Sequence, residues 1–256
     1  KTLHNLGVLA NERGDQEAAK SLFQRELAIF EKIDPSGSLL RDSLMGLGEV
    51  ALRQGKGHEA EELWGRALAI AEKLHPKGPN SASCLQGLAQ AAKLQGRSEE
   101  AEGLLRRALA IWQEINPDAY PGSIHLHLGI LFFEQNRDEL AESHLRTAIR
   151  RDEKFRRPLP EVYHALARFQ ARRGRLDEAA ATFLSAIDAL ESQRTNLGGA
   201  RESQWLYGSS LGDLYFEAAA NQIALGRAQN AWQLVERGRA QGFQDLLAQR
   251  DLRFAG

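Results

Sequence analysis

The sequence predicts an all-α solenoid, a stack of about six helix pairs, and two observations lead to this fold class. Glycine recurs at Gly14, Gly55 and Gly96, so that the same residue type returns after 41 residues and again after 41. Between these glycines, apolar residues recur every three or four positions, which is the spacing of one face of an α-helix. A period of about 20 to 50 residues is typical of proteins whose units stack on one another, because one helix pair cannot bury its apolar face alone.

The turn between the two helices of each unit is the most regular feature of the sequence. It carries a residue type that tolerates the left-handed backbone conformation with which many helices end. In chain order these turn residues are Gly14, Gly55, Gly96, Asn136, Gly174 and Gly226. Each one predicts a first helix before it and a second helix after it.

Side-chain size also repeats, and this predicts how the two helices of a unit cross. Seven residues before the first five turn residues the chain has a small residue, namely Gly7, Gly48, Ala89, Gly129 and Ala167. The second helices place a large apolar residue in the same register, namely Phe23, Trp64, Leu105, Leu145 and Phe183. We expect the large side chain to fill the space beside the small one. Prolines that end the second helix follow at Pro35, Pro76, Pro117 and Pro158.

The repeats divide the chain into residues 1–195, with five units of about 38–41 residues, and residues 196–256, with a stretched sixth unit. The sixth unit ends in a long second helix without a proline stop, so we expect it to be a junction to a further domain. Neither end has the polar cap that a solenoid needs, which also predicts a piece of a longer protein. Glu26 stands where other units have Ala67, Ala108, Ala148 and Ala186, and it predicts looser packing in the first unit.

The combination of a small residue, a glycine turn, an alanine and a large apolar residue resembles the tetratricopeptide repeat. The stretches LGVLANERGDQEAAKSLF and LGEVALRQGKGHEAEELW carry this resemblance, which extends over nearly the whole chain. The common unit of that family has about 34 residues, and the longer period here resembles its kinesin-light-chain and bacterial signalling members. The resemblance implies a right-handed superhelical curl, a concave surface lined by the first helices, and a protein or peptide partner bound there.

The end of the chain resembles the junction in bacterial tetratricopeptide proteins of the CHAT family, where a helix leads into a caspase-like peptidase domain. The residues that carry this second resemblance are Gly226, Ala231, Glu236, Arg237, Arg239, Ala240, Leu246 and Leu247. It implies a catalytically silent sensing region that contacts a Cys/His peptidase domain beyond Gly256. An ordinary terminal repeat is the alternative, and the function is then that of a free-standing scaffold or adaptor, or of a peptide-sensing regulator.

The composition is typical of a globular protein in a reducing compartment. The 256 residues include 33 basic and 34 acidic side chains, a formal net charge of −1, which argues against a dedicated nucleic-acid or membrane-surface protein. No stretch approaches the roughly 18 to 20 apolar residues that a membrane helix needs. Cys84 is the only cysteine, so an internal disulfide is excluded and a cytoplasmic location is expected.

No residue pattern predicts a catalytic, metal or cofactor site. None of the seven histidines has a second histidine four residues away, and His125 and His127 must point in different directions on a helix. The glycines do not form the G-x-G-x-x-G or G-x-x-x-x-G-K-[ST] patterns of nucleotide sites. Cys84 lies among apolar positions, as expected of a small buried residue. We therefore expect no cofactor and no enzymatic activity in this chain.

The expected partner-binding residues lie on the first helices. The tetratricopeptide resemblance maps groove positions onto a polar set, Asn11, Asp42, Glu49, Arg53, Gln86, Gln90 and Lys93, and onto a mixed set, Leu126, Ile130, Phe133, Glu134, His164, Arg168 and Arg172. In the mixed set we expect Phe133 to be an apolar anchor beside the basic Arg168 and Arg172, since hot spots combine these residue types. A core position is the alternative for Phe133, because Phe132 and Phe133 cannot face the same way.

The strongest charge run lies between Arg150 and Arg175. Nine basic residues, Arg150, Arg151, Lys154, Arg156, Arg157, Arg168, Arg172, Arg173 and Arg175, stand against Asp152, Glu153 and Glu161, which leaves six positive charges. RNA or an acidic protein could dock on such a surface. The alternative is that these residues complement the dipole near a helix C-terminus.

Overall fold

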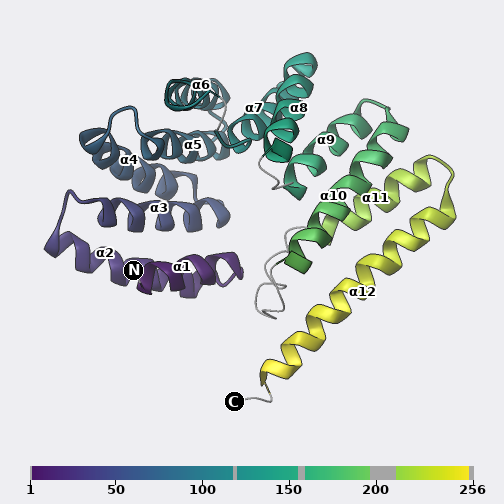
Figure 1. Ribbon diagram of the computed structural model, residues 1–256, viewed down its shortest axis with the longest axis horizontal. Helices are drawn as coiled ribbons and strands as arrows, with labels where there is room; N and C mark the ends of the chain where they lie inside the picture. Colours follow the sequence, from purple (N-terminus) through teal and green to yellow (C-terminus); the bar gives the residue numbers. More distant parts are fainter. Residues whose placement is uncertain (1, 118–119, 155–158, 197–211, 254–256) are drawn as a thin grey trace. The chain divides into compact units, whose positions relative to one another are not determined.

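The computed structural model describes residues 2–117, 120–154, 159–196 and 212–253, with the backbone alone for residues 12, 154, 193–196, 212 and 241–253. Within these ranges all regular structure is helical (Figure 1), and the predicted α-solenoid is confirmed. In chain order the helices form successive pairs: α1 (Thr2–Glu12) and α2 (Gln16–Ile33), α3 (Ser38–Arg53) and α4 (Gly57–Leu74), α5 (Pro79–Leu94) and α6 (Ser98–Ile115), α7 (Ser123–Glu134) and α8 (Asp138–Lys154), α9 (Pro160–Arg172) and α10 (Leu176–Asn196), and α11 (Gly212–Ala224) and α12 (Ala228–Arg253).

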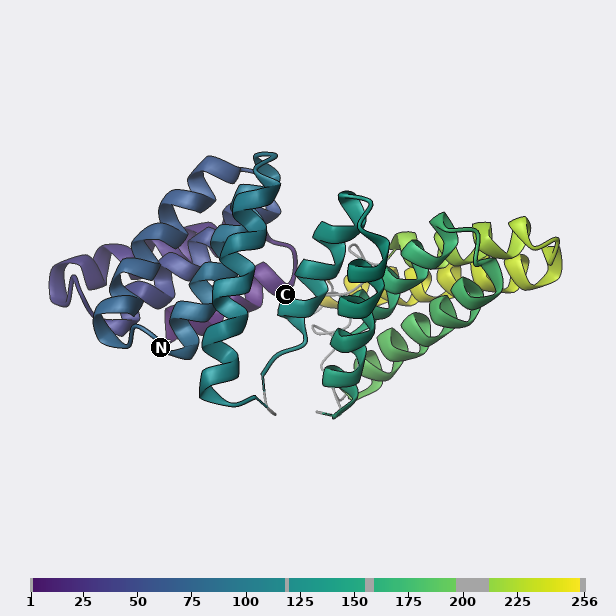
Figure 2. The ribbon, with the colours of Figure 1, turned by 90° about the horizontal axis from the view of Figure 1, so that it is seen from above.

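The helices group into two compact units, Lys1–Leu131 and Phe132–Gly256, so that the boundary between them falls within α7. The predicted division at residues 195 and 196 falls at the end of α10 and stays a prediction about domains. Within each unit, successive helices run back and forth and pack on their neighbours in the chain (Figure 2).

Neighbouring first helices lie closer together than neighbouring second helices in the first unit. Helix α3 contacts α1 and α5 in addition to its partners α2 and α4, and these contacts are more extensive than any between α2, α4 and α6. The first helices therefore form a continuous wall, and we call this surface of α1, α3 and α5 the first-helix wall. It is the wall that carries the predicted polar groove residues.

All six predicted turn residues adopt the backbone conformation for which they were assigned. The five turn glycines have φ between 71° and 75°, and Asn136 has φ of 57°. At the second turn, the Gly55 N–H donates to the Leu52 carbonyl at 3.0 Å and the Lys56 N–H donates to the Ala51 carbonyl at 2.9 Å. These two hydrogen bonds satisfy the last carbonyls of α3 in the pattern of a Schellman motif.

Large rings on the second helices pack between glycines of two successive first helices. A Cβ atom added to Gly48 would lie 2.6 Å from Nε1 of Trp64, and one added to Gly87 would lie 2.2 Å from Cδ2 of the same ring. Phe23 sits in the same way, with corresponding distances of 2.7 Å at Gly7 and 2.6 Å at Gly46. Gly7 and Gly48, which belong to the same unit as the ring, are the predicted small residues. Gly46 and Gly87 belong to the next unit, so the ring packs at the interface between the two units.

Glu26 is buried where the other units have alanine, with 2% of its surface exposed. Its Oε2 lies 3.1 Å from Nδ1 of His4, so α1 and α2 make a polar contact where they cross. Helices α2, α4 and α6 end two residues before Pro35, Pro76 and Pro117, as expected, whereas Pro158 lies outside the described residues.

Two further features concern the single cysteine and the length of the apolar helices. Cys84 is fully buried, and this burial raises the pKa of its thiol to about 12, which keeps the sulfur protonated and unreactive. Across the described ranges, no helix is both long and apolar enough to cross a membrane.

Candidate functional site

Many of the predicted site residues recur at fixed distances from the turn residue. Gln86, Gln90 and Lys93 stand ten, six and three residues before Gly96, and Leu126, Ile130 and Phe133 stand at the same distances before Asn136. Spacings of four and three residues place side chains on one face of a helix. These residues therefore share one helix face that repeats from unit to unit, whereas Arg53, Glu134 and Arg172 stand two residues before their turn residues and lie beside that face.

In α1 and α3 the predicted polar residues are largely engaged within the wall itself. Asp42 accepts a hydrogen bond from Nη2 of Arg41 at 2.7 Å, and Glu49 accepts one from Nε of Arg53, four residues on, at 3.2 Å. Asn11 is 8% exposed, and its buried Oδ1 has no hydrogen-bond partner among the described residues. The charges of α3 are thus paired along the helix that carries them.

In α5 the three predicted residues have different environments. Gln86 is 8% exposed and donates to Oγ of Ser123 in α7 at 3.3 Å, so it joins the two helices. Gln90 and Lys93 are half-buried and line an opening. This opening is the strongest candidate for a binding site in the first unit.

The opening, which we call the α5–α7 pocket, has a volume of about 300 Å³. Its apolar wall is formed by Leu52, Leu94, Leu105, Ile130 and Leu131, and its polar lining by Gln90, Lys93 and His127. Gln90, Lys93 and Ile130 belong to the predicted set, and the structure brings them together from α5 and α7. Apolar walls with a few polar groups are usual in ligand pockets.

The imidazole of His127 lines this pocket and makes no hydrogen bond to the described residues; its Nδ1 is buried. Burial and, secondarily, the positive charge of Lys93 lower the pKa of His127 to about 4. The ring is therefore neutral near pH 7, with one nitrogen able to donate a hydrogen bond and the other able to accept one.

In the second unit, Phe133 is half-buried and packs its ring edge against Phe169, with 5.3 Å between ring centroids. The guanidinium carbon of Arg172 lies 4.8 Å from the centre of the Phe133 ring. Phe132 is fully buried, so the two neighbouring rings face different ways, as predicted. Phe133 is thus part of a local stack that also presents part of its surface to solvent.

Two of the three predicted residues of α9, His164 and Arg168, face a carboxylate that the predicted set does not include. Glu217 of α11 lies 2.8 Å from Nε2 of His164 and 3.5 Å from Nε of Arg168. Glu134, at the end of α7, is exposed, and Leu126 is half-buried. The rim around Phe133 therefore carries mixed charge rather than a purely positive one.

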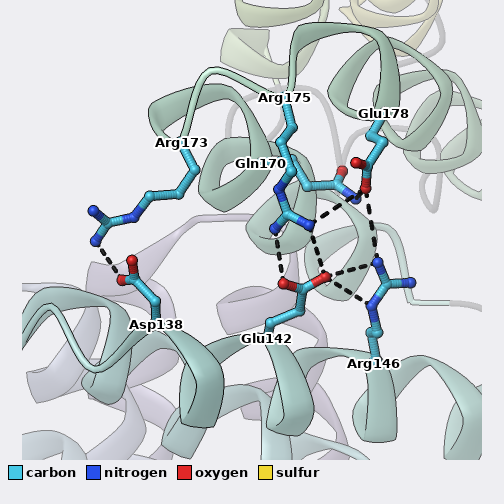
Figure 3. A network of polar contacts seen from close by, with 7 residues as sticks. All are labelled: Asp138, Glu142, Arg146, Gln170, Arg173, Arg175 and Glu178. Atoms are coloured by element: carbon cyan, nitrogen blue, oxygen red, sulfur yellow. Dashed lines mark hydrogen bonds and ion pairs between the residues drawn. The ribbon is translucent and has the colours of Figure 1, made fainter.

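Two arginines of the charge run, Arg173 and Arg175, pair with acidic residues of α8 and α10 (Figure 3). Arg173 contacts Asp138, and Arg175 donates to Oε2 of Glu142 at 2.8 Å. Arg146 also donates to Glu142, at 2.7 Å, and the hydrogen bonds from Arg175 and Arg146 lower the pKa of the Glu142 carboxyl.

The excess of six positive charges is therefore an overestimate for the described residues. Counting along the sequence between Arg150 and Arg175 leaves out Asp138, Glu142 and Glu178, which the helix packing brings to the same place (Figure 3). Arg150 donates to Oγ1 of Thr147 at 2.8 Å. Arg156 and Arg157, and the side chain of Lys154, lie outside the described residues.

The sixth unit adds an exposed apolar stripe to the same repeated face. Phe216, Ala220 and Ile223 of α11 stand ten, six and three residues before Gly226, and Phe216 and Ile223 are 63% and 66% exposed. The repeat positions, applied to the last turn residue, would have predicted them from the sequence. The same repeat positions thus add residues of α11 to the candidate set.

The described side chains offer contacts suited to recognition: apolar surface, hydrogen-bonding groups and paired charges. Among them, no three His, Cys, Asp or Glu residues gather in a way that could hold a metal ion.

Solved structures with similar folds support the description of the chain as a helical-repeat protein. BtubC (BKLC) from P. vanneervenii is 20% identical, with a TM-score of 0.66 over 91% of this chain and 90% of that one. A thermophilic tetratricopeptide protein of Thermus thermophilus is 23% identical, with a TM-score of 0.60 over 87% of this chain and 98% of that one. A Rap protein complexed with competence and sporulation factor is 14% identical, with a TM-score of 0.67 over 94% of this chain and 74% of that one.

No curated protein matches the sequence. Models of the tetratricopeptide repeat match residues 39–114, 95–154 and 126–193. Together these matches extend from residue 39 to residue 193, more than half of the chain. With the repeated turns and helix pairs described above, they show that the chain belongs to the tetratricopeptide-repeat family.

Proposed function

We propose that this chain is a protein-recognition module that binds a segment of a partner protein along the exposed face of its first helices. The observation that carries the proposal is that the repeated helix-face positions recur in α11 as the exposed stripe of Phe216, Ala220 and Ile223. Large apolar side chains that are about two-thirds exposed gain free energy when a partner covers them.

The comparison with the Rap protein supports this proposal by analogy. That protein has a similar fold and is complexed with competence and sporulation factor. Sequence identity of 14% carries the fold only, so the partner of this chain has to be found by experiment.

A peptide or protein partner fits the described surface better than RNA does. RNA binding needs basic side chains that are free to neutralise phosphates, whereas Arg173 and Arg175 are paired with Asp138 and Glu142. An acidic partner that contacted Arg173 or Arg175 would have to compete with the same carboxylates.

The finer proposal, that the chain is the sensing part of a protease of the CHAT type, rests on residues of α12. Arg237 has a role within the fold, since it donates to Oε2 of Glu191 in α10 at 2.6 Å, and Arg239 pairs with Glu236 at 3.1 Å. The side chains of Leu246 and Leu247 lie outside the described residues. The simpler proposal requires only the recognition function: the chain is then a free-standing adaptor or a peptide-sensing regulator. We propose a cytoplasmic location for it.

The test is affinity capture with the full chain, followed by binding measurements with the purified partner. Replacing Phe216 and Ile223 by aspartate should weaken binding at least about tenfold, since exposed anchors at hot spots contribute more than about 1 kcal/mol each. Both side chains are mostly exposed, so helical content and unfolding midpoint should change little.

Trp232→Asp is the matched control, because Trp232 is 62% exposed but lies on the second helix of the same pair. It should leave partner binding unchanged. Equal loss of binding in the control and in the double variant would contradict the assignment of the first-helix face. Capture that is lost after nuclease treatment would instead support RNA.

A further inference from the structure

We propose that the α5–α7 pocket binds an aromatic ring that carries a hydroxyl group, as in the tyrosine side chain of a partner segment. The proposal deepens the proposed function and rests on it for the identity of the partner. The pocket itself can be tested without a partner, because a small phenol has the same chemistry.

The space for a ring arises from a departure from the repeat. At the first two interfaces between units, a ring on the second helix (Phe23 or Trp64) fills the gap against a glycine of the next first helix (Gly46 or Gly87). At the third interface the corresponding residues are Leu105 and His127. An aliphatic side chain and an imidazole thus take the positions of the ring and the glycine, and both line the pocket of about 300 Å³.

The walls of the pocket select an apolar group. Leu52, Leu94 and Ile130 line it from three different first helices, and Leu105 lines it from α6. A volume of about 300 Å³ lies at the lower end of the range for small-molecule sites. One substituted benzene ring is an occupant of suitable size and polarity.

His127 supplies the requirement for a hydroxyl. Its ring lines the pocket, and its buried Nδ1 has no hydrogen-bond partner among the described residues. The imidazole is neutral, so a ligand that reaches Nδ1 meets either a donor or an acceptor. A phenol hydroxyl can donate and accept, so it can pair with either tautomer of the ring. An indole N–H or a plain benzene ring satisfies fewer of these possibilities, and a buried polar group without a partner is unfavourable.

The test compares p-cresol with toluene, which lacks only the hydroxyl. Both are titrated into the full chain while NMR follows the methyl groups of Leu105 and Ile130 and the ring of His127. We expect both probes to shift the methyl signals and p-cresol alone to shift the imidazole signals. His127→Phe should lower the ratio of p-cresol affinity to toluene affinity about two- to tenfold, the range expected for one neutral hydrogen bond.

Leu94→Trp tests the location, because Leu94 lines the pocket and is 51% exposed, so a larger side chain there should block the opening without disturbing the core. Leu74→Trp is its control: Leu74 also ends a helix and is 41% exposed, but it does not line the pocket. The proposal is supported if Leu94→Trp prevents p-cresol binding and Leu74→Trp does not.

The proposal is overturned if neither probe binds, if both tryptophan variants bind p-cresol as the wild type does, or if His127→Phe leaves the ratio of affinities unchanged. If p-cresol binds but no protein is captured, the proposed function is refuted and the assignment of the pocket as a phenol site stands. If a partner is captured and its binding is insensitive to Leu94→Trp, the proposed function stands and the role of the pocket in partner binding is refuted.

Discussion

The contact between Trp64 and Gly87 predicts that the smallest possible enlargement at residue 87 destabilises the fold. The Cβ atom of Gly87→Ala would lie 2.2 Å from Cδ2 and 2.3 Å from Cε2 of the Trp64 ring. The ring cannot move away freely, because Gly48 limits it on the other side, where a Cβ would lie 2.6 Å from Nε1. The tryptophan is 6% exposed and therefore has no route toward solvent.

Two opposing terms set the magnitude. Overpacking of a well-filled core usually costs about 1 to 3 kcal/mol, whereas glycine to alanine in a helix interior gains up to about 1 kcal/mol. We expect Gly87→Ala to lower the free energy of unfolding by about 1 to 2 kcal/mol. In a Trp64→Leu background the clash is absent, so the same change should be neutral or slightly stabilising. The coupling between the two positions should then be about 2 kcal/mol.

Urea unfolding followed by circular dichroism at 222 nm measures these differences. Gly65→Ala is the control for helix propensity, because Gly65 lies within α4 and nothing lies within 4 Å of an added Cβ. It should stabilise the chain by up to about 1 kcal/mol. If Gly87→Ala behaves like Gly65→Ala, or if its cost persists in the Trp64→Leu background, the packing account is wrong.

Two further predictions concern the turn and the pocket. Gly55 has φ of 71°, so Gly55→Val should lower the free energy of unfolding by about 1 to 2 kcal/mol in the same assay. Gly55→Asn should cost clearly less, because Asn136 occupies the equivalent turn position with φ of 57°. Equal losses in the two variants would contradict the turn assignment. His127 has its pKa lowered from 6.5 to about 4, so the unfolded chain binds the proton more readily, and stability should be full above pH 6.5 and fall as the pH is lowered toward 4, by at most about 3 kcal/mol. His127→Gln should flatten this part of the stability profile, and an unchanged slope between pH 6.5 and about pH 5 would show that another group is responsible.

Much of the fold could be predicted because its signals are local. A turn that needs positive φ restricts the residue type to Gly or Asn, so Gly14 and Asn136 mark helix ends without any knowledge of tertiary contacts. The helix spacing likewise places Gly48 beside Trp64 within one unit. The second glycine, Gly87, belongs to the next unit, and its role follows only once the two units are stacked.

The candidate site was less predictable because its electrostatics depend on contacts between distant residues. Summing charges from Arg150 to Arg175 omits Glu142, which receives hydrogen bonds from Arg146 and Arg175 across the helix interface. Glu217 is 53 residues from His164 in the chain and only 2.8 Å from it in space. No periodicity in a single sequence reveals such pairs, since exposed charged positions vary freely between units.

A departure from the repeat adds information about function that the repeated helix face does not give. Where Trp64 meets Gly87 the interface is filled, and its residues can be explained by packing alone. At the third interface, Leu105 and His127 line an open, mostly apolar pocket, and Nδ1 of His127 has no hydrogen-bond partner among the described residues. Packing does not require this arrangement, which leaves hydrogen-bonding capacity unused. A site with an unused polar group and an apolar wall gains stability from a ligand that supplies both, which is the reason to expect recognition at this interface rather than at its two regular neighbours.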